Sequence, residues 1–279
     1  MAHKHGISSN STKNIKAAFF LNLAFTIVEI VGGFMTNSVA IFSDAIHDLG
    51  DSLSLGLAWY FQKISQKDRD DDYSYGYRRF SVIGALINTV VLFFGCIFIL
   101  WETIPRLIHP EEVDPKGMII LSIIGIIING AAVFNLKKGT SLNEKVVSLH
   151  LLEDVLGWLA VLIGSIVMLF WDIPIIDPIL SILITCFILF NIYRNIKSTM
   201  AVILQRIPSN VNLDEIKSYL NNNPKINSFS DIHIWSLDGE YNVMTININL
   251  QPNAKPEIIS DIHSDLARYN IQHCTIELC

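Results

Sequence analysis

The sequence contains one polar pattern twice, a histidine followed four residues later by an aspartate, in segments that are otherwise apolar. The first copy is His47 and Asp51, and the second is His150 and Asp154. On an α-helix, residues four apart lie about 40° apart around the axis and one turn along it, so each pair shares one face. Two facing pairs would supply two imidazole nitrogens and two carboxylate oxygens, a ligand set that suits tetrahedral Zn²⁺.

Acidic groups at these positions are costly if the segments cross a membrane. Each costs about 2.5–3.5 kcal/mol near the middle of a bilayer, on scales derived from helix insertion. Hydrogen bonds between helices would explain such groups without metal, but hydrogen bonding alone does not require the same motif twice. A divalent cation would offset two carboxylate charges in an apolar interior, so we interpret the two pairs as a metal site.

Six further polar residues lie in or next to the same apolar segments. For those beside the histidine–aspartate pairs, we favour orienting the imidazole or lining a water-filled path over direct ligation. The others would either contribute to a proton or ion path or hydrogen-bond among themselves. The first group is Asp44, Asp48 and Glu153, and the second is Glu29, Asn22 and Asn88.

The composition predicts an α-helical polytopic membrane protein. Of the 279 residues, 51% are hydrophobic and only 16% are charged, whereas a soluble domain normally has about a quarter charged residues. Six apolar runs are long enough to cross about 30 Å of hydrocarbon, and the last begins with Asp177-Pro178, which is typical of a helix N-cap and first turn. The runs lie at roughly 15–36, 39–62, 80–104, 117–136, 147–171 and 175–198.

The distribution of lysine and arginine predicts the orientation of these spans. If the N-terminus is cytoplasmic, every Lys and Arg in residues 1–206 except Arg106 and Lys116 falls on the cytoplasmic side. This asymmetry follows the positive-inside rule, so we expect a multi-pass protein of the plasma membrane with both termini in the cytoplasm. Residues 1–14 would form a cytoplasmic tail, and 15–206 the transmembrane domain. The tail has no adjacent cleavage site, so the first run is interpreted as a permanent span.

The composition changes from about Ile207, and residues 207–279 are predicted to form a small cytoplasmic domain. The order of its elements is αββαβ, which indicates an α+β sandwich with helices on one face of a sheet. A domain of about 70 residues is marginally stable alone, so we expect a homodimer. The predicted elements are a helix at 213–220, strands at 228–237 and 241–250 joined through Asp238-Gly239, a helix at 256–269 and a strand at 274–278.

Short motifs spread over nearly the whole chain resemble those of the cation diffusion facilitators, which are zinc-exporting metal-ion/proton antiporters, particularly the bacterial members with short loops. The resemblance implies a homodimer with six helices per subunit, a ferredoxin-like cytoplasmic domain, and a transport site at the two histidine–aspartate pairs. The motifs that carry it are Asn22, Glu29-x-x-Gly32-Gly33, Asp44-Ala45-x-His47-x-x-x-Asp51, Tyr75-Gly76-Tyr77-x-Arg79, Ala85-Leu86-Ile87-Asn88, His150-x-x-x-Asp154, Asp177-Pro178-x-x-Ser181 and His233-x-Trp235.

Two regions depart from the pattern of that family. Some relatives bind a second metal through loop histidines where this chain has Tyr73 and Tyr77, so we expect no metal there and an ordinary solvated acidic run at 70–72. In the cytoplasmic domain Ser230, Asn247 and Asn249 replace histidines of metal-binding relatives. Four scattered residues remain as candidates for a cytoplasmic metal site, although separate surface or packing roles are favoured: His233, His263, Glu277 and Cys279.

The sequence therefore predicts a transporter that exports Zn²⁺, with Cd²⁺ or Co²⁺ as further candidate substrates, in exchange for protons by alternating access. The same imidazole and carboxylate atoms bind metal when deprotonated and release it when protonated. A Mn²⁺ or Fe²⁺ exporter is the alternative, disfavoured because His47 supplies nitrogen. An intramembrane zinc hydrolase would need a motif such as His-Glu-x-x-His, which is missing, so no enzyme is expected. No basic face interleaved with aromatic residues suggests a nucleic-acid partner.

Overall fold

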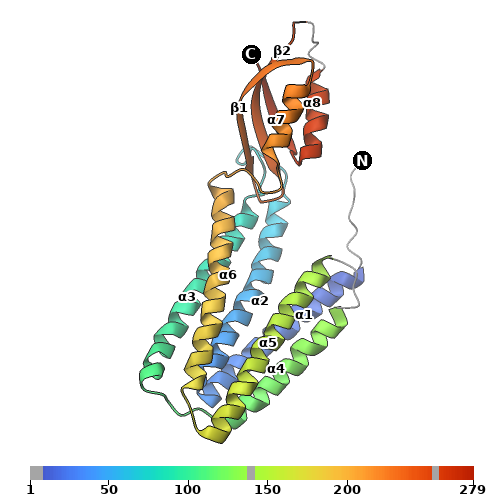
Figure 1. Ribbon diagram of the computed structural model, residues 1–279. Coiled ribbons are helices and arrows are strands. Elements are labelled where there is room, and N and C mark those ends of the chain that lie inside the picture. The colour runs from blue at the N-terminus through green and yellow to red at the C-terminus, as the bar shows by residue number, and fades with distance from the viewer. Residues whose placement is uncertain (1–8, 137–141, 253–257) are drawn as a thin grey trace. The chain divides into compact units, whose positions relative to one another are not determined.

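A computed structural model describes residues 9–136, 142–252 and 258–279 of the chain. In these residues, six long helices precede a small sheet flanked by two shorter helices (Figure 1). Each long helix overlaps one of the predicted apolar runs. The helices are α1 (Ser9–Thr36), α2 (Val39–Ser65), α3 (Phe80–Ile108), α4 (Pro115–Leu136), α5 (Leu142–Trp171) and α6 (Ile176–Ile203).

Helices α3, α4, α5 and α6 contain stretches that are long and apolar enough to cross a membrane. Among the residues whose side chains the structure describes, α1 contributes the apolar stretch Leu23–Thr36, and α2 carries three aspartates that reduce its apolar character. Large apolar side chains on α3 face outward, with Phe94 65% exposed and Trp101 81% exposed, as lipid contact requires. The chain is therefore a multi-pass membrane protein, as its composition predicts.

The chain divides into two compact units, and the division passes through α2, α3 and α6. The first lies within Met1–Leu57 and Ile87–Arg194, and the second within Ala58–Leu86 and Asn195–Cys279. In the first unit, the fully buried indole of Trp158 on α5 packs against Gly125 of α4. A Cβ atom added to Gly125 would lie only 2.5 Å from this ring. Glycine here lets the two helices approach closely, a common device in membrane helix packing.

The beginning of α6 corrects one sequence prediction. Asp177 was expected to cap the helix that it begins, but its carboxylate instead caps α2. It accepts hydrogen bonds from Ser38 Oγ at 2.5 Å, Val39 N at 2.8 Å and Ala40 N at 3.3 Å. The amides at a helix N-terminus have no partners within their own helix, and they attract negative charge. An acidic residue before a proline indicates a helix start, but the sequence does not show which helix the carboxylate reaches.

Hydroxyl groups extend this connection along the interior of the first unit. The Ser181 Oγ on α6 lies 2.6 Å from Ser43 Oγ on α2 and 2.9 Å from Thr103 Oγ1 on α3. All three residues are fully buried. These hydrogen bonds join three helices at one level, so they fix the position of α2, the helix that carries His47.

The second unit contains the predicted αββαβ order. Strands β1 and β2 are antiparallel, β3 is parallel to β2, and the strand order is β1-β2-β3. Figure 1 shows both helices on one side of the sheet, where Ile216, Leu220, Ile246 and Ile262 form part of a buried core. The elements are α7 (Leu213–Asn222), β1 (Ile226–Ser236), β2 (Asn242–Leu250), α8 (Ile258–Leu266), a 3-10 helix (Ala267–Tyr269) and β3 (His273–Leu278).

The predicted turn at Asp238-Gly239 joins β1 to β2. The Asp238 Oδ1 accepts hydrogen bonds from the amides of Glu240 and Tyr241 at 2.9 and 2.7 Å. Gly239 adopts a φ of +97°, a conformation that side chains disfavour. The turn chemistry read from the sequence is therefore confirmed.

The close contact between α4 and α5 is testable by substitution. We expect Gly125→Val to destabilise the protein by about 1–3 kcal/mol, because the new methyl groups would collide with the Trp158 ring. The matched control is Gly130→Val on the same helix, where an added Cβ meets nothing within 4 Å. Thermal unfolding of both variants in detergent measures the difference. Equal melting temperatures for the two variants would contradict the packing argument.

Candidate functional site

Helices α2 and α5 bring three of the four predicted metal ligands together in the first unit. The His47 Nε2 lies 3.7 Å from Asp51 Oδ2 and 3.9 Å from Asp154 Oδ1. The side chain of Asp154 is 3% exposed, that of His47 is 14% exposed and that of Asp51 is 26% exposed. His150 belongs to α5, but its side chain lies outside the described residues. The i, i+4 spacing on α2 has thus placed an imidazole and a carboxylate on one face, opposite a carboxylate of α5.

These separations are close to those of a metal coordination shell. With Zn–N and Zn–O bonds of about 2.0–2.1 Å, tetrahedral geometry places ligand atoms about 3.4 Å apart. The observed gaps of 3.7 and 3.9 Å exceed this value by only a few tenths of an ångström. Among the described residues, no three His, Cys, Asp or Glu side chains already meet as a metal-binding group. Each carboxylate oxygen therefore needs to move only slightly closer to the imidazole nitrogen, and a fourth donor is needed, for these side chains to hold a metal ion.

Additional carboxylates surround this trio. Glu29 of α1 is 0% exposed, Asp48 is 1% exposed and Asp44 is 4% exposed. The Asp44 Oδ1 lies 3.7 Å from the Cβ position of Gly157, about one turn along α5 from Asp154. Glu29 lies within electrostatic range of Asp44, Asp48 and Asp154. Burying several carboxylates close together is unfavourable unless cations accompany them, so the cluster is an attractive place for a divalent cation.

The other predicted accessory residues are not all part of this cluster. Glu153 is exposed, although it precedes the buried Asp154. Asn88 of α3 is buried, with 8% of its surface exposed, and the side chain of Asn22 lies outside the described residues. One neighbour was not predicted: the Phe187 ring of α6 lies edge-on to the His47 imidazole, with centroids 6.5 Å apart. No sequence spacing links these two residues, because they come from different helices.

The acidic run at residues 70–72, in the loop between α2 and α3, is exposed to solvent as predicted, but one of its aspartates also has a structural role that was not predicted. Asp70 organises the loop, because its carboxylate accepts hydrogen bonds from the amides of Asp72 and Tyr73 and from the Tyr77 hydroxyl at 2.6 Å. The phenol of Tyr77 and these amides hold the pKa of Asp70 below its usual value. The same hydrogen bond raises the pKa of Tyr77 to about 12. The phenol therefore stays protonated at neutral pH and donates to Asp70.

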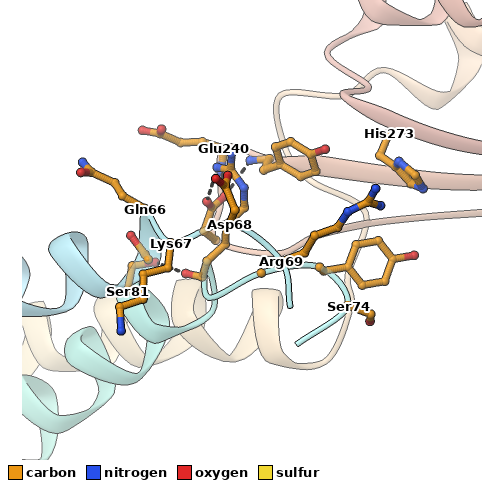
Figure 2. A pocket seen from close by; sticks show the side chains of 14 residues that line it. Gln66, Lys67, Asp68, Arg69, Ser74, Ser81, Glu240 and His273 are labelled. Carbon is orange, nitrogen blue, oxygen red and sulfur yellow. Dashed lines mark hydrogen bonds and ion pairs between the residues drawn. The ribbon is translucent and has the colours of Figure 1, made fainter. Parts of the chain in front are cut away.

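A polar cavity of about 790 Å³ lies beside this loop, within the second unit. Figure 2 shows Lys67, Asp68 and Arg69 from the loop and Glu240 and His273 from the sheet domain around it. Arg78 connects the loop to the sheet domain. Its guanidinium lies 3.4 Å from Asp238 Oδ2 and stacks 4.2 Å from the centroid of the Tyr241 ring.

The four candidates for a cytoplasmic metal site do not converge within one chain. His233 of β1 lies level with Thr245 of β2, whereas Glu277 of β3 lies level with Asn247 of β2. Two strand spacings therefore separate His233 from Glu277, about 10 Å before their offset along the strands is added. The His233 Nε2 instead contacts Asp231 Oδ1 at 2.9 Å. His263 lies on α8, and Cys279 follows β3.

The long apolar helices and the buried cluster of ionisable groups define a multi-pass membrane protein with a polar site in its interior. The sequence also matches the family described as the Cation efflux transmembrane domain, over residues 15–204. The chain belongs to this family, the cation diffusion facilitators. Its members move cations across membranes, so the protein is a cation efflux transporter and not an enzyme.

Individual relatives align over almost the whole chain. A cadmium, cobalt and zinc/H(+)-K(+) antiporter of Bacillus velezensis is 31% identical over 287 residues, covering 100% of this chain and 92% of the relative. The metal cation efflux system protein CzcD of Cupriavidus metallidurans is 32% identical, covering 99% and 89%. The zinc transporter ZitB of Pectobacterium atrosepticum is 30% identical, covering 100% and 89%. The similarity thus includes the C-terminal domain as well as the helices.

The role of Asp70 in ordering its loop can be measured by amide hydrogen exchange. We expect Asp70→Asn to accelerate exchange at the Asp72 and Tyr73 amides several-fold, because the ionised acceptor of both is lost. Asp71→Asn makes the same chemical change one residue away and should have little effect.

The pH dependence of this protection follows from the lowered pKa of Asp70. A carboxyl group whose pKa is lower in the folded state stabilises that state above its unfolded pKa of about 3.9. The contribution is lost as the pH falls through the lower, folded value. Protection that disappears already at pH 6 would contradict this assignment.

Proposed function

We propose that the protein exports Zn²⁺ from the cytoplasm in exchange for protons, with Cd²⁺ and Co²⁺ as further substrates. The proposal rests on the approach of Asp51 and Asp154 to the His47 imidazole beside a buried acidic cluster. His150, one turn before Asp154 on α5, is proposed as the fourth ligand. Relatives described as zinc transporters and as a cadmium, cobalt and zinc antiporter support this choice of substrates.

The nature of the donor atoms supports zinc over harder cations. An imidazole nitrogen beside carboxylate oxygens suits Zn²⁺ with four ligands, whereas Mn²⁺ prefers oxygen ligands and a larger coordination number. A Mn²⁺ or Fe²⁺ exporter is therefore the less favoured alternative. Cysteine is not part of the proposed site, because ligation needs only the two histidine–aspartate pairs.

Proton exchange follows from the acid–base chemistry of the same ligands. Metal binds to neutral imidazole and ionised carboxylates, so protons and metal compete for the same atoms. A site that faces the cytoplasm would load metal, and a site that faces a more acidic exterior would exchange it for protons. The proposed ligands come from two different helices, so a relative movement of α2 and α5 would open the site to one side and then to the other.

The proposal includes an arrangement in the plasma membrane. We propose six spans within residues 15–206, cytoplasmic termini, and a ferredoxin-like C-terminal domain at 207–279, assembled as a homodimer. The two further spans are α1, which contributes the apolar stretch Leu23–Thr36, and α2, whose lower apolar character follows from its three aspartates. The positions of lysine and arginine support the orientation.

The transport site is tested in proteoliposomes with an acidic lumen. We expect Asp154→Asn and Asp51→Asn to reduce gradient-driven zinc uptake by more than about tenfold, because each removes a ligand charge. The matched control is Asp172→Asn, beyond the end of α5, where asparagine tolerates the left-handed backbone with φ of 51°. Unchanged uptake in both site variants would remove the proposed site, as would an equal loss in the control.

The choice of metal is tested by His47→Asp. Replacing nitrogen with a carboxylate oxygen makes the donor set harder, so we expect the ratio of Mn²⁺ to Zn²⁺ transport to rise. Competition between the two metals in the same proteoliposomes measures this ratio. If the ratio stays at the wild-type value, selectivity does not depend on His47.

A further inference from the structure

A small apolar pocket lies in the second unit, where two strongly apolar helices meet the sheet domain. It has a volume of about 210 Å³, and its walls are formed by the first two turns of α3, the last residues of α6 and the end of β1. One charged residue, Arg79, stands among these apolar walls. The lining residues are Arg79, Val82, Ile83, Leu86, Val202, Ile203 and Leu237.

The position of this pocket along the two helices matches the boundary of a membrane. The apolar run at 80–104 begins directly after Arg79, and the run at 175–198 ends four residues before Val202. Val82 and Ile83 therefore belong to the first turn of one apolar run, whereas Arg79, Val202 and Ile203 lie just beyond the ends of the two runs. Ile83 is 44% exposed and Ile203 is 40% exposed, so the pocket is open to the surface beside the ends of the two apolar runs, where lipid headgroups are expected.

The charge of Arg79 is available to a ligand. Its neighbour Arg78 is neutralised by Asp238, at 3.4 Å, but no described carboxylate forms an ion pair with Arg79. Lys197 and Arg206 add exposed positive charge near the same end of α6. An arginine beside an apolar wall fits a molecule that joins a phosphate to a hydrocarbon chain.

We propose that this pocket binds an anionic phospholipid, with the phosphate on Arg79 and the beginning of one acyl chain against Val82, Ile83, Leu86 and Val202. Charge selects the headgroup, because no carboxylate in the described part of the chain is paired with the guanidinium. Apolar contact adds to the affinity, since each buried methylene strengthens binding about fourfold. This site is separate from the cation site and does not depend on which metal is transported.

Native mass spectrometry of the full-length protein tests the proposal. The protein would be incubated with equal amounts of phosphatidylglycerol and phosphatidylcholine, and the lipid retained by each chain would be counted. We expect the wild type to retain phosphatidylglycerol in preference to phosphatidylcholine. Arg79→Gln should retain about fivefold less phosphatidylglycerol than the wild type, which is the effect of one arginine near a membrane surface. Arg79→Lys should keep most of it.

Two further variants separate the pocket from general surface charge. Arg69→Gln removes an exposed arginine from the preceding loop and should leave retention unchanged. Val202→Trp fills the pocket without changing its charge and should lower retention of phosphatidylglycerol. Size-exclusion profiles that match the wild type show that each variant is folded.

Three results would overturn the proposal. One is equal retention of phosphatidylglycerol by the wild type and Arg79→Gln. Another is a loss of retention in Arg69→Gln as large as the loss in Arg79→Gln. The third is efficient disulfide formation between Ile83→Cys chains together with no lipid retained by the wild type. That last result would show that a second copy of the chain covers the pocket.

Discussion

Several carboxylates lie together in the apolar interior of the first unit, and their mutual repulsion is the constraint on which the rest of the structure depends. Glu29, Asp44, Asp48 and Asp154 are each at most 4% exposed. Two like charges 6 Å apart repel by about 3 kcal/mol even at an effective dielectric constant of 20. A buried cluster of this kind lowers its free energy by taking up protons or a metal cation, and an exchanger alternates between those two states.

The surrounding helices hold these carboxylates in position through contacts made by residues that are not proposed metal ligands. The carboxylate of Asp177 and the Ser181 hydroxyl attach α6 to α2, so they fix the position of His47 relative to its neighbours. On the other side, Gly125 lets α4 and α5 pack tightly around Trp158, one turn from Asp154. The proposed cation site thus has a helix contact on each side, while the distances from His47 Nε2 to Asp51 and Asp154 exceed those of a coordination shell by a few tenths of an ångström.

Local periodicity accounts for what could be predicted from the sequence. The apolar runs located all six long helices, the i, i+4 spacing placed His47 beside Asp51, and Asp238-Gly239 marked the hairpin. Contacts between distant segments could not be predicted in the same way. Asp177 caps α2 and not its own helix, Phe187 lies beside His47, and the exposed Asp70 orders its loop through hydrogen bonds. In each case the partner is chosen by packing or by the path of the backbone, which residue type and spacing do not specify.

X-ray absorption spectroscopy of the purified protein loaded with one equivalent of Zn²⁺ is the most direct test of the buried site. The account predicts four nitrogen and oxygen donors at about 2.0–2.1 Å, with scattering from two imidazole rings. Sulfur donors at about 2.3 Å, or six oxygen donors without imidazole, would contradict it.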